Sequence, residues 1–165
     1  MKYAIVEGGR QEAKPGHAGI CQACKSPMVA RCGNVRVHHW AHRGEQNCDT
    51  WGENETEWHR NWKDQFPVNW QEIVHLSENG ERHIADVKTD QEWVLEFQHS
   101  KINTDERNAR EVFYKKLVWV VNGSRRKNDK MQFFRALDGR KFGGIQLNLW
   151  RIPVADKCAL LRDWI

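Results

Sequence analysis

Hydrophobic residues recur with a helical period in two stretches of the chain. Trp58, Trp62 and Phe66 are spaced four residues apart, so they share one side of a helix that we expect over Asn54–Gln65, with Asn54 as its N-cap. A second helix is expected from Thr104 to about Lys116. Its buried side is predicted to consist of four hydrophobic residues, Ala109, Val112, Phe113 and Leu117.

Four further stretches follow the pattern of β-strands. Gln71–Leu76 and Arg82–Lys88 flank an Asn-Gly turn, a strong signal for a hairpin, and Glu92–Gln98 alternates its side chains between two faces. Leu117–Val121 is hydrophobic throughout, as expected of a buried parallel strand. With the two helices the order is α-β-β-β-α-β, in which the last three elements form a right-handed crossover. The pattern predicts an α/β (α+β) fold.

Composition limits the class of protein. The 165 residues suffice for one domain and a small appendage, and nine Trp and six Phe argue against disorder. The longest uncharged hydrophobic run, Leu117–Val121, is far shorter than the roughly 20 residues of a membrane-spanning helix, and Met1–Ala18 lacks the hydrophobic segment of a signal peptide. We therefore expect a cytoplasmic protein with no membrane partner. The net charge of +4 favours a polyanionic partner without proving one.

The character of the chain changes near Gly44–Asp49. Residues 1–50 are rich in Cys and His, whereas helix and strand periods begin at Trp51. We expect a small zinc-binding module over residues 1–50 and a second domain over residues 51–165 that ends in a C-terminal extension. Within this extension, Ile145–Ile152 is strand-like and Asp156–Trp164 is helix-like.

Four Cys and His residues of the N-terminal module have the spacing of a zinc site. Cys21-x2-Cys24 is followed after fourteen residues by His39-x2-His42, and two thiolates with two imidazoles match a four-coordinate structural zinc ion. The histidine spacing suits the first turn of a helix. The fourth ligand is the least determined, because three other residues compete for these positions: His38, Cys32 and Cys48. The alternative is a set of ordinary buried cysteines and surface histidines.

Acidic residues on the second and third predicted strands suggest a second metal site. Asp86 lies on one strand, and Glu96 and Gln98 share a face of the next because they are two residues apart. Phosphodiester hydrolysis uses divalent cations held by oxygen ligands, and Asp86 and Glu96 can share one such ion. Gln98 then offers a neutral hydrogen-bonding group. Taken alone, the pattern also fits a polar strand face exposed to water.

Glu55, His59 and Lys63 recur at helical spacing in the first predicted helix. At about 100° per residue, Glu55 falls within the aromatic side, His59 lies just beyond its edge and Lys63 lies further toward water. A carboxylate and an imidazole beside a buried seam need a partner, which favours a functional site. The alternative is a surface pair between Glu55 and His59.

Several short motifs occur in a fixed order along residues 12–122. They are Cys21-x2-Cys24, His39-Trp40-Ala41-His42, Glu55-Thr56-x2-His59-x3-Lys63, Ile84-Ala85-Asp86-Val87, Glu96-Phe97-Gln98-x-Ser100-x-Ile102 and a stretch over Arg107–Asn122. In these motifs the chain resembles the competence protein CoiA-like family, whose nuclease domain belongs to the PD-(D/E)XK (restriction-endonuclease-like) superfamily.

The resemblance implies a restriction-endonuclease-like αβββαβ core behind an N-terminal zinc-finger-like module. It implies that Asp86 and Glu96 are ligands of Mg²⁺ or Mn²⁺ and that Gln98 takes the place of the usual catalytic lysine. Glu55 would be a further acid of the catalytic site, and His59 is a motif residue. The chain departs from the family in having Thr56 where Ser is frequent, and the uncharged Gln98 leaves open how the attacking water is oriented.

These observations predict a Mg²⁺- or Mn²⁺-dependent deoxyribonuclease with a structural zinc ion. Its partner would be DNA, with single-stranded and branched forms among the candidates, and the zinc module would brace the first helix or contact DNA. Basic clusters at Lys115–Lys116, Arg125–Lys127, Lys130 and Arg135–Lys141 fit either phosphate contacts or a solvated face. The alternatives are a catalytically silent nucleic-acid-binding protein and a zinc-braced adaptor for protein partners. The sequence does not indicate the oligomeric state.

Overall fold

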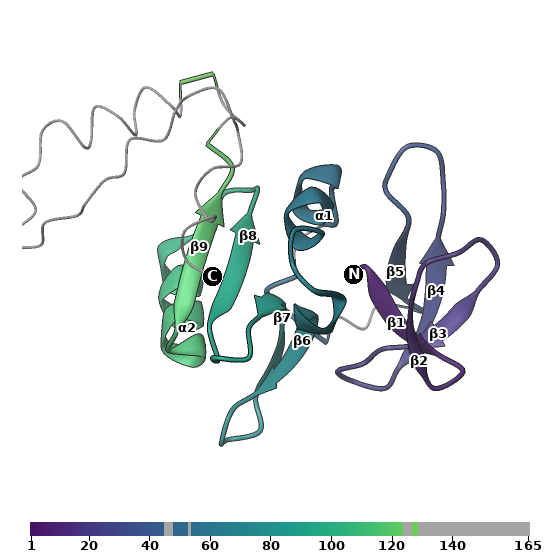
Figure 1. Cartoon of the computed structure of the whole chain (residues 1–165), viewed down its shortest axis with the longest axis horizontal. Helices are drawn as coiled ribbons and strands as arrows, with labels where there is room; N and C mark the ends of the chain where they lie inside the picture. Colours follow the sequence, from purple (N-terminus) through teal and green to yellow (C-terminus); the bar gives the residue numbers. More distant parts are fainter. Residues whose placement is uncertain (45–47, 53, 124–126, 129–165) are drawn as a thin grey trace, which may run out of the picture. The chain divides into compact units, whose positions relative to one another are not determined.

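The computed structural model describes residues 1–44, 48–52, 54–123 and 127–128. Met1–Arg125 is one compact unit, and its described part holds two sheets and two α-helices (Figure 1). This arrangement confirms a mixed α+β protein. The predicted elements Ile145–Ile152 and Asp156–Trp164 lie outside the described residues. The predicted division at residues 50 and 51 stays a prediction, although no described strand crosses it.

The first sheet has five short antiparallel strands in the order β2-β1-β3-β4-β5. They are β1 (Tyr3–Val6), β2 (Gly9–Glu12), β3 (Ala18–Ile20), β4 (Pro27–Arg31) and β5 (His39–His42). The β1–β2 hairpin turns at Glu7 and Gly8, which both have positive φ, as a two-residue hairpin requires. The core of this sheet contains Met28 and Trp40, and the Trp40 indole donates to the Gln11 carbonyl at 2.8 Å.

Helix α1 (Glu57–Lys63) is shorter than predicted because its N-cap is Thr56 and not Asn54. Thr56 has extended backbone angles, and its hydroxyl accepts from the His59 N–H at 3.3 Å. Glu55 therefore precedes the helix. The predicted aromatic stripe does form, because the rings of Trp58, Trp62 and Phe66 all pack against Phe97, with centroids 5.7–6.4 Å away.

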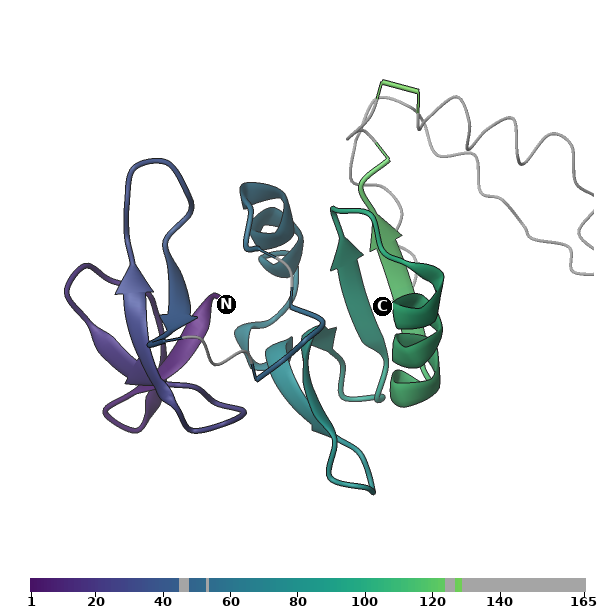
Figure 2. The same ribbon diagram turned by 180° about the vertical axis from the view of Figure 1, so that it is seen from behind.

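The second sheet has the order β6-β7-β8-β9. After the 3₁₀ helix η1 (Val68–Trp70) come β6 (Gln71–Leu76), β7 (Arg82–Lys88), β8 (Val94–Gln98), helix α2 (Thr104–Tyr114) and β9 (Leu117–Val121). Strands β8 and β9 are parallel, with Val94 opposite Leu117 and Gln98 opposite Val121. The α-helices and strands of this part therefore follow the predicted order α-β-β-β-α-β, and Figures 1 and 2 show α2 beside β9 from opposite sides.

The predicted buried side of α2 is correct for Phe113 and Leu117, which pack against a buried core cluster, and wrong for its other two residues. Ala109 is exposed and Val112 is 78% exposed, whereas Arg110 and Tyr114 are buried. Arg110 and Tyr114 are four residues apart and share one side of the helix, and Val112, midway between them, points away. The helix is capped by Asn103, whose side chain accepts from the Glu106 N–H at 2.7 Å.

The beginning of the chain is attached to the second sheet through Glu72 on β6. The backbone N–H groups of Lys2 and Tyr3 donate to the two carboxylate oxygens of Glu72, at 2.6 and 2.9 Å. Glu72 has a φ of 48°, in the left-handed region that non-glycine residues rarely adopt. Glu72 lies beside the acidic residues described below. Backbone strain of this kind is concentrated at functional sites.

Candidate functional site

Three cysteines and one histidine converge beside the first sheet. Their ligand atoms, on Cys21, Cys24, His42 and Cys48, all lie within 4.8 Å of one another. Cys21 Sγ lies 3.6 Å from Cys48 Sγ, Cys24 Sγ lies 3.3 Å from His42 Nε2, and Cys48 Sγ lies 3.5 Å from His42 Nε2. Zinc bonds of about 2.3 Å to sulfur and about 2.0 Å to nitrogen give tetrahedral edges of roughly 3.8 and 3.5 Å. The donor set and spacing therefore fit zinc.

A tight turn between β3 and β4 presents the first two thiols. The Cys21 N–H donates to the Ser26 carbonyl at 2.9 Å, and the Cys21 carbonyl accepts from the Lys25 N–H at 3.0 Å. Lys25 has a φ of 64°, which closes the turn. His42 ends β5, opposite Met28 of β4. The ligands are thus held by a turn and a strand end of the same small sheet.

His39, predicted as a ligand, is not in this group, and Cys48 is. The prediction placed His39 and His42 on a helical turn, but they lie on β5, where residues three apart point to opposite faces. The His39 ring is instead 2.9 Å from the Val37 carbonyl through Nδ1. The other two competing residues, His38 and Cys32, are also outside the group.

The thiols of this group influence one another. Burial disfavours the Cys24 thiolate, but hydrogen bonds with Ser26, Cys48 and His42 outweigh it and lower the pKa of Cys24 to about 6. Burial, followed by the neighbouring Cys24 and Cys21 sulfurs, raises the pKa of Cys48. One thiolate thus opposes the ionisation of the next. Because metal ligands must be deprotonated, a bound cation would relieve this repulsion.

Asp86 and Glu96 meet where the β7–β8 ladder ends. The ladder pairs Lys88 with Val94 and Val87 with Leu95. In the next position, the Phe97 N–H donates to Asp86 Oδ2 at 2.9 Å, and the Asp86 N–H donates to Glu96 Oε1 at 3.4 Å. Each carboxylate therefore accepts a backbone N–H group of the neighbouring strand, and the two acids lie together as predicted.

Lys63 lies among three carboxylates, where the prediction had placed it toward water. Its side chain is 2% exposed, and its Nζ is 2.9 Å from Glu55 Oε2, 2.9 Å from Glu72 Oε1 and 3.6 Å from Asp86 Oδ1. Burial alone would lower the pKa of Lys63, but the carboxylates outweigh it and raise the pKa above 10.5. The sheet register, with Gln71 opposite Val87 and Ile73 opposite Ala85, puts Glu72 across from Asp86. Lys63 neutralises this pair of like charges.

The acids of this site differ in their electrostatics. Burial outweighs Lys63 and raises the pKa of Asp86, and burial together with Asp86 raises the pKa of Glu96 well above 4.5. For Glu72 the balance is reversed, because Lys63 and the N–H groups of Lys2 and Tyr3 overcome burial and lower its pKa to about 2. Glu72 is thus a stable anion, whereas the ionisation of Asp86 and the ionisation of Glu96 oppose each other.

Arg110 holds Glu96 from the other side. Its Nη1 donates to Glu96 Oε2 at 2.9 Å, and its Nη2 donates to Glu106. Sequence reasoning did not assign a role to Arg110 or to Glu72. Their burial depends on contacts with other elements, Glu96 for Arg110 and the Lys2 and Tyr3 N–H groups for Glu72, which no local pattern marks.

Glu55 and His59 lie at the margin of the carboxylate cluster. Glu55 precedes the helix, but its side chain is only 5% exposed and joins the cluster through Lys63. The His59 ring is 2.8 Å from the Thr56 hydroxyl through Nδ1 and lies 5.8 Å from the His99 ring. Both residues act on Asp86 through their charges, since His59 lowers and Glu55 raises the pKa of Asp86.

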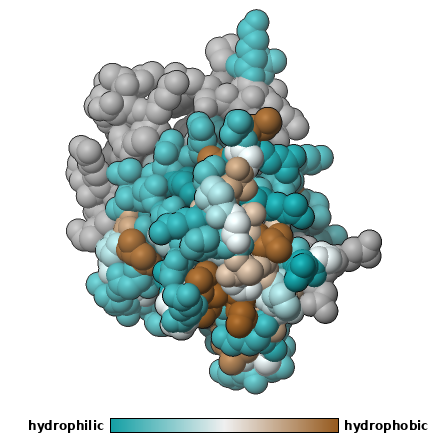
Figure 3. Space-filling view, turned by 90° about the vertical axis from the view of Figure 1, so that its right-hand side faces the viewer, coloured by the Kyte–Doolittle hydropathy of each residue, from teal (hydrophilic) through white to brown (hydrophobic). Residues whose placement is uncertain are grey.

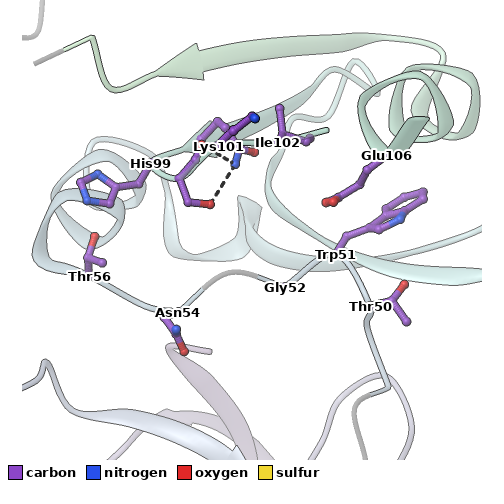
Figure 4. Close-up of a pocket in the computed structure, with 11 residues that line it drawn as sticks. Thr50, Trp51, Gly52, Asn54, Thr56, His99, Lys101, Ile102 and Glu106 are labelled. Atoms are coloured by element: carbon purple, nitrogen blue, oxygen red, sulfur yellow. Dashed lines mark hydrogen bonds between the residues drawn. The ribbon is translucent and has the colours of Figure 1, made fainter. Parts of the chain in front are cut away.

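Gln98 lines a pocket of about 460 Å³ (Figure 4). Its amide donates to the Ser100 carbonyl at 3.1 Å, and Trp51, Thr56, Lys101 and Glu106 also line the pocket. Because Glu106 and Glu96 are both partners of Arg110, the pocket is connected to the carboxylate pair by one guanidinium. Asp86 and Glu96 are not part of the pocket's described lining.

Within the described residues, the only group of three or more closely spaced Cys, His, Asp or Glu ligands is the Cys3His group. Asp86 and Glu96 offer a pair of carboxylates instead. Mg²⁺ and Mn²⁺ are commonly held by one or two protein carboxylates, with water and substrate oxygens as the remaining ligands. Asp86 and Glu96 supply two carboxylates, and their oxygens here contact backbone N–H groups, Lys63 and Arg110.

The fold and the Cys3His group define a mixed α+β protein with a candidate metal-binding module. Residues 11–50 match the family model of the competence protein CoiA, N-terminal domain. The match contains all four residues of the Cys3His group, so this part of the chain is similar to competence-related proteins. Comparisons with curated proteins and with solved structures found no match. Neither α-helix in the described part of the chain has the length and hydrophobicity to cross a membrane.

Proposed function

We propose that the chain is a Mg²⁺- or Mn²⁺-dependent nuclease that hydrolyses DNA phosphodiester bonds with a restriction-endonuclease-like core. The observation that carries this proposal is the meeting of Asp86 and Glu96 at the end of the β7–β8 ladder, with both pKa values raised. Perturbed carboxyl groups brought together by two strands are typical of catalytic sites. The observed order of helices and strands and the similarity to competence-related proteins support the proposal.

Each residue of the site has a part in this proposal. Asp86 and Glu96 would hold the divalent ion, which supplies a more acidic water and neutralises charge on the phosphate. Lys63 and Arg110 keep the two carboxylates in place, because each cation contacts one acid and also a second carboxylate. Gln98 offers a neutral amide toward the pocket, where a nucleotide of the substrate would lie.

The Cys3His group is proposed to hold a structural zinc ion. Its four ligands leave no open position for a reacting water, which is typical of structural sites. The loop that leads into β5 contacts α1 directly, because the Arg60 guanidinium donates to the His38 carbonyl at 2.7 Å. The zinc module would therefore brace the helix that carries Lys63.

One observation favours a second candidate, a catalytically silent nucleic-acid-binding protein. Lys63 already supplies a positive charge 3.6 Å from Asp86, and the neutral Gln98 replaces the usual lysine. A protein of this kind would bind DNA without cleaving it. The two candidates differ in whether the bound DNA is cleaved.

The test is incubation of the zinc-loaded protein with linear, circular, single-stranded and branched DNA, with and without Mg²⁺ or Mn²⁺. The nuclease proposal predicts products that require the added ion and are absent with Asp86→Asn. A matched control is Asp90→Asn, which neutralises an exposed aspartate in the β7–β8 turn. Ion-dependent products from Asp86→Asn as abundant as those from Asp90→Asn would refute the assignment. Binding without cleavage in any of the four substrates would support the silent candidate.

A further inference from the structure

The hairpin that joins β4 to β5 has an open and strongly exposed tip. Arg31 and His39 are a cross-strand pair at its base, and Val35 at the tip is 97% exposed. A shallow depression of about 390 Å³ lies on this hairpin and is lined by Arg31, Arg36 and His39, among others. The hairpin therefore presents two guanidinium groups and an imidazole to one concave surface.

The segment of the chain that contains this hairpin carries only positive charge. Residues 13–44 contain five Lys or Arg residues and no Asp or Glu, although the whole chain has 26 basic and 22 acidic residues. The five cations, all exposed, are Lys14, Lys25, Arg31, Arg36 and Arg43. Within the described residues no ion pair involves any of them, in contrast to Lys63, Lys88 and Arg110. Unpaired cations of one sign create a positive potential that attracts polyanions.

The turn before β3 extends this positive surface. The His17 carbonyl accepts from the Ala30 N–H at 3.1 Å, and the Lys14 carbonyl accepts from the His17 N–H at 3.1 Å. Lys14 and His17 therefore lie next to the end of β4. We call the surface formed by Lys14, His17, Arg31, Arg36 and His39 the basic edge. On the side of the molecule that carries the first sheet, hydrophilic residues predominate, with hydrophobic residues scattered among them (Figure 3).

We propose that the basic edge binds the phosphate backbone of DNA, away from the carboxylate site. This inference rests on the proposed function for its choice of DNA as partner, but it concerns a different surface. Guanidinium groups match phosphate oxygens through paired hydrogen bonds, and Arg31 and Arg36 on the two sides of the hairpin can contact neighbouring phosphates. The hydrophobic Val35 at the tip suits contact with sugars. The edge positions DNA, and cleavage occurs at Asp86 and Glu96.

The experiment measures binding of a labelled duplex to the zinc-loaded full chain at several salt concentrations, without added Mg²⁺ or Mn²⁺. Each phosphate contact contributes about 0.9 to the slope of log K against log salt concentration. We therefore expect Arg31→Ala/Arg36→Ala to reduce the slope by about 1.8 and to weaken binding at least about tenfold at low salt. Arg31→Lys/Arg36→Lys should retain the slope because both charges remain.

The matched control is Lys88→Ala/Arg107→Ala, which removes the same net charge from cations that are paired with Glu92 and Glu111. An unchanged slope in the Arg31/Arg36 variant, or an equal reduction in the control, would overturn the proposal. So would competition by polyglutamate as strong as that by unlabelled DNA, because the site would then bind any polyanion. Zinc content and circular dichroism verify folding of each variant. The experiment measures binding and not cleavage. Its result therefore tests the basic edge even if the chain proves not to cleave DNA.

Discussion

Glu72, which is buried, and Asp86, which is partly buried, are neighbouring acids that should respond differently to neutralisation. Glu72 is stabilised as an anion by Lys63 and by two backbone N–H groups, which lower its pKa from 4.5 to about 2. At about 1.4 kcal/mol per pH unit, this difference corresponds to about 3 kcal/mol of folding free energy at pH 7. We therefore expect Glu72→Gln to lower the free energy of unfolding by about 3 kcal/mol.

The sign of the pH dependence follows from the direction of the shift. Because the pKa of Glu72 is lower in the folded protein than in the unfolded chain, its contribution is fully present above about pH 4.5 and is lost as the pH falls toward 2. The pKa of Asp86 is raised, so folding disfavours its charged form. Asp86→Asn keeps an oxygen that can accept from Phe97 and should leave the free energy of unfolding unchanged or higher.

The assay is urea denaturation of both variants at pH 7 with zinc present, beside Glu78→Gln as an exposed control in the β6–β7 turn. Surface changes of the control kind usually stay within about 0.5 kcal/mol. The reasoning would be refuted if Glu72→Gln unfolded within this margin of the original protein. It would also be refuted if Asp86→Asn lost as much stability as Glu72→Gln.

Four other outcomes are expected. Cys48→Ser should lower zinc affinity by more than about 100-fold, whereas His39→Ala should keep about one zinc ion per chain, as determined by metal analysis. Zinc loss in His39→Ala alone would contradict the ligand set. Because burial and Asp86 raise the pKa of Glu96, metal-dependent cleavage should increase with pH through a midpoint above 4.5 in a rate–pH profile, and a flat profile would oppose this. Gln98→Lys should retain or increase the cleavage rate, since a cation beside the pocket stabilises developing phosphate charge. A rate as low as that of Asp86→Asn would show that this position does not accept the usual lysine. Glu55→Gln should slow cleavage at least about tenfold by loosening Lys63, and a rate matching that of Glu57→Gln on exposed α1 would show that Glu55 has no such role.

The second sheet was largely predictable because its signals are local. The Asn-Gly turn and its flanking strands gave β6 and β7 with the observed bounds, and the uniformly hydrophobic Leu117–Val121 gave β9. The first sheet was not predicted as a sheet, because its strands have only three to five residues and little alternation. Its Cys and His residues nevertheless indicated a metal-binding module.

The errors at the site have a common physical cause. His39 and Glu55 were placed by assuming helical geometry, but β5 is a strand and α1 begins only at Glu57. The burial of Lys63 depends on Glu72 and Asp86, which reach it only through the folded sheet. Cys48 likewise joins Cys21 from 27 residues away. Contacts of this kind leave no periodic trace in the sequence, whereas the Asp86–Glu96 pair follows from strand pairing.

The central claim is that Asp86 and Glu96 hold a divalent ion for DNA cleavage. The most direct measurement compares the Mn²⁺-dependent cleavage rate of Asp86→Asn/Glu96→Gln with that of Asp90→Asn/Glu78→Gln, which removes two exposed acids. Both variants are first verified to retain zinc and to bind DNA with equal affinity in the absence of Mn²⁺. We expect the first variant to lose metal-dependent cleavage and the second to cleave at the original rate. Cleavage by the Asp86/Glu96 variant within a factor of about two of the original rate would contradict the account.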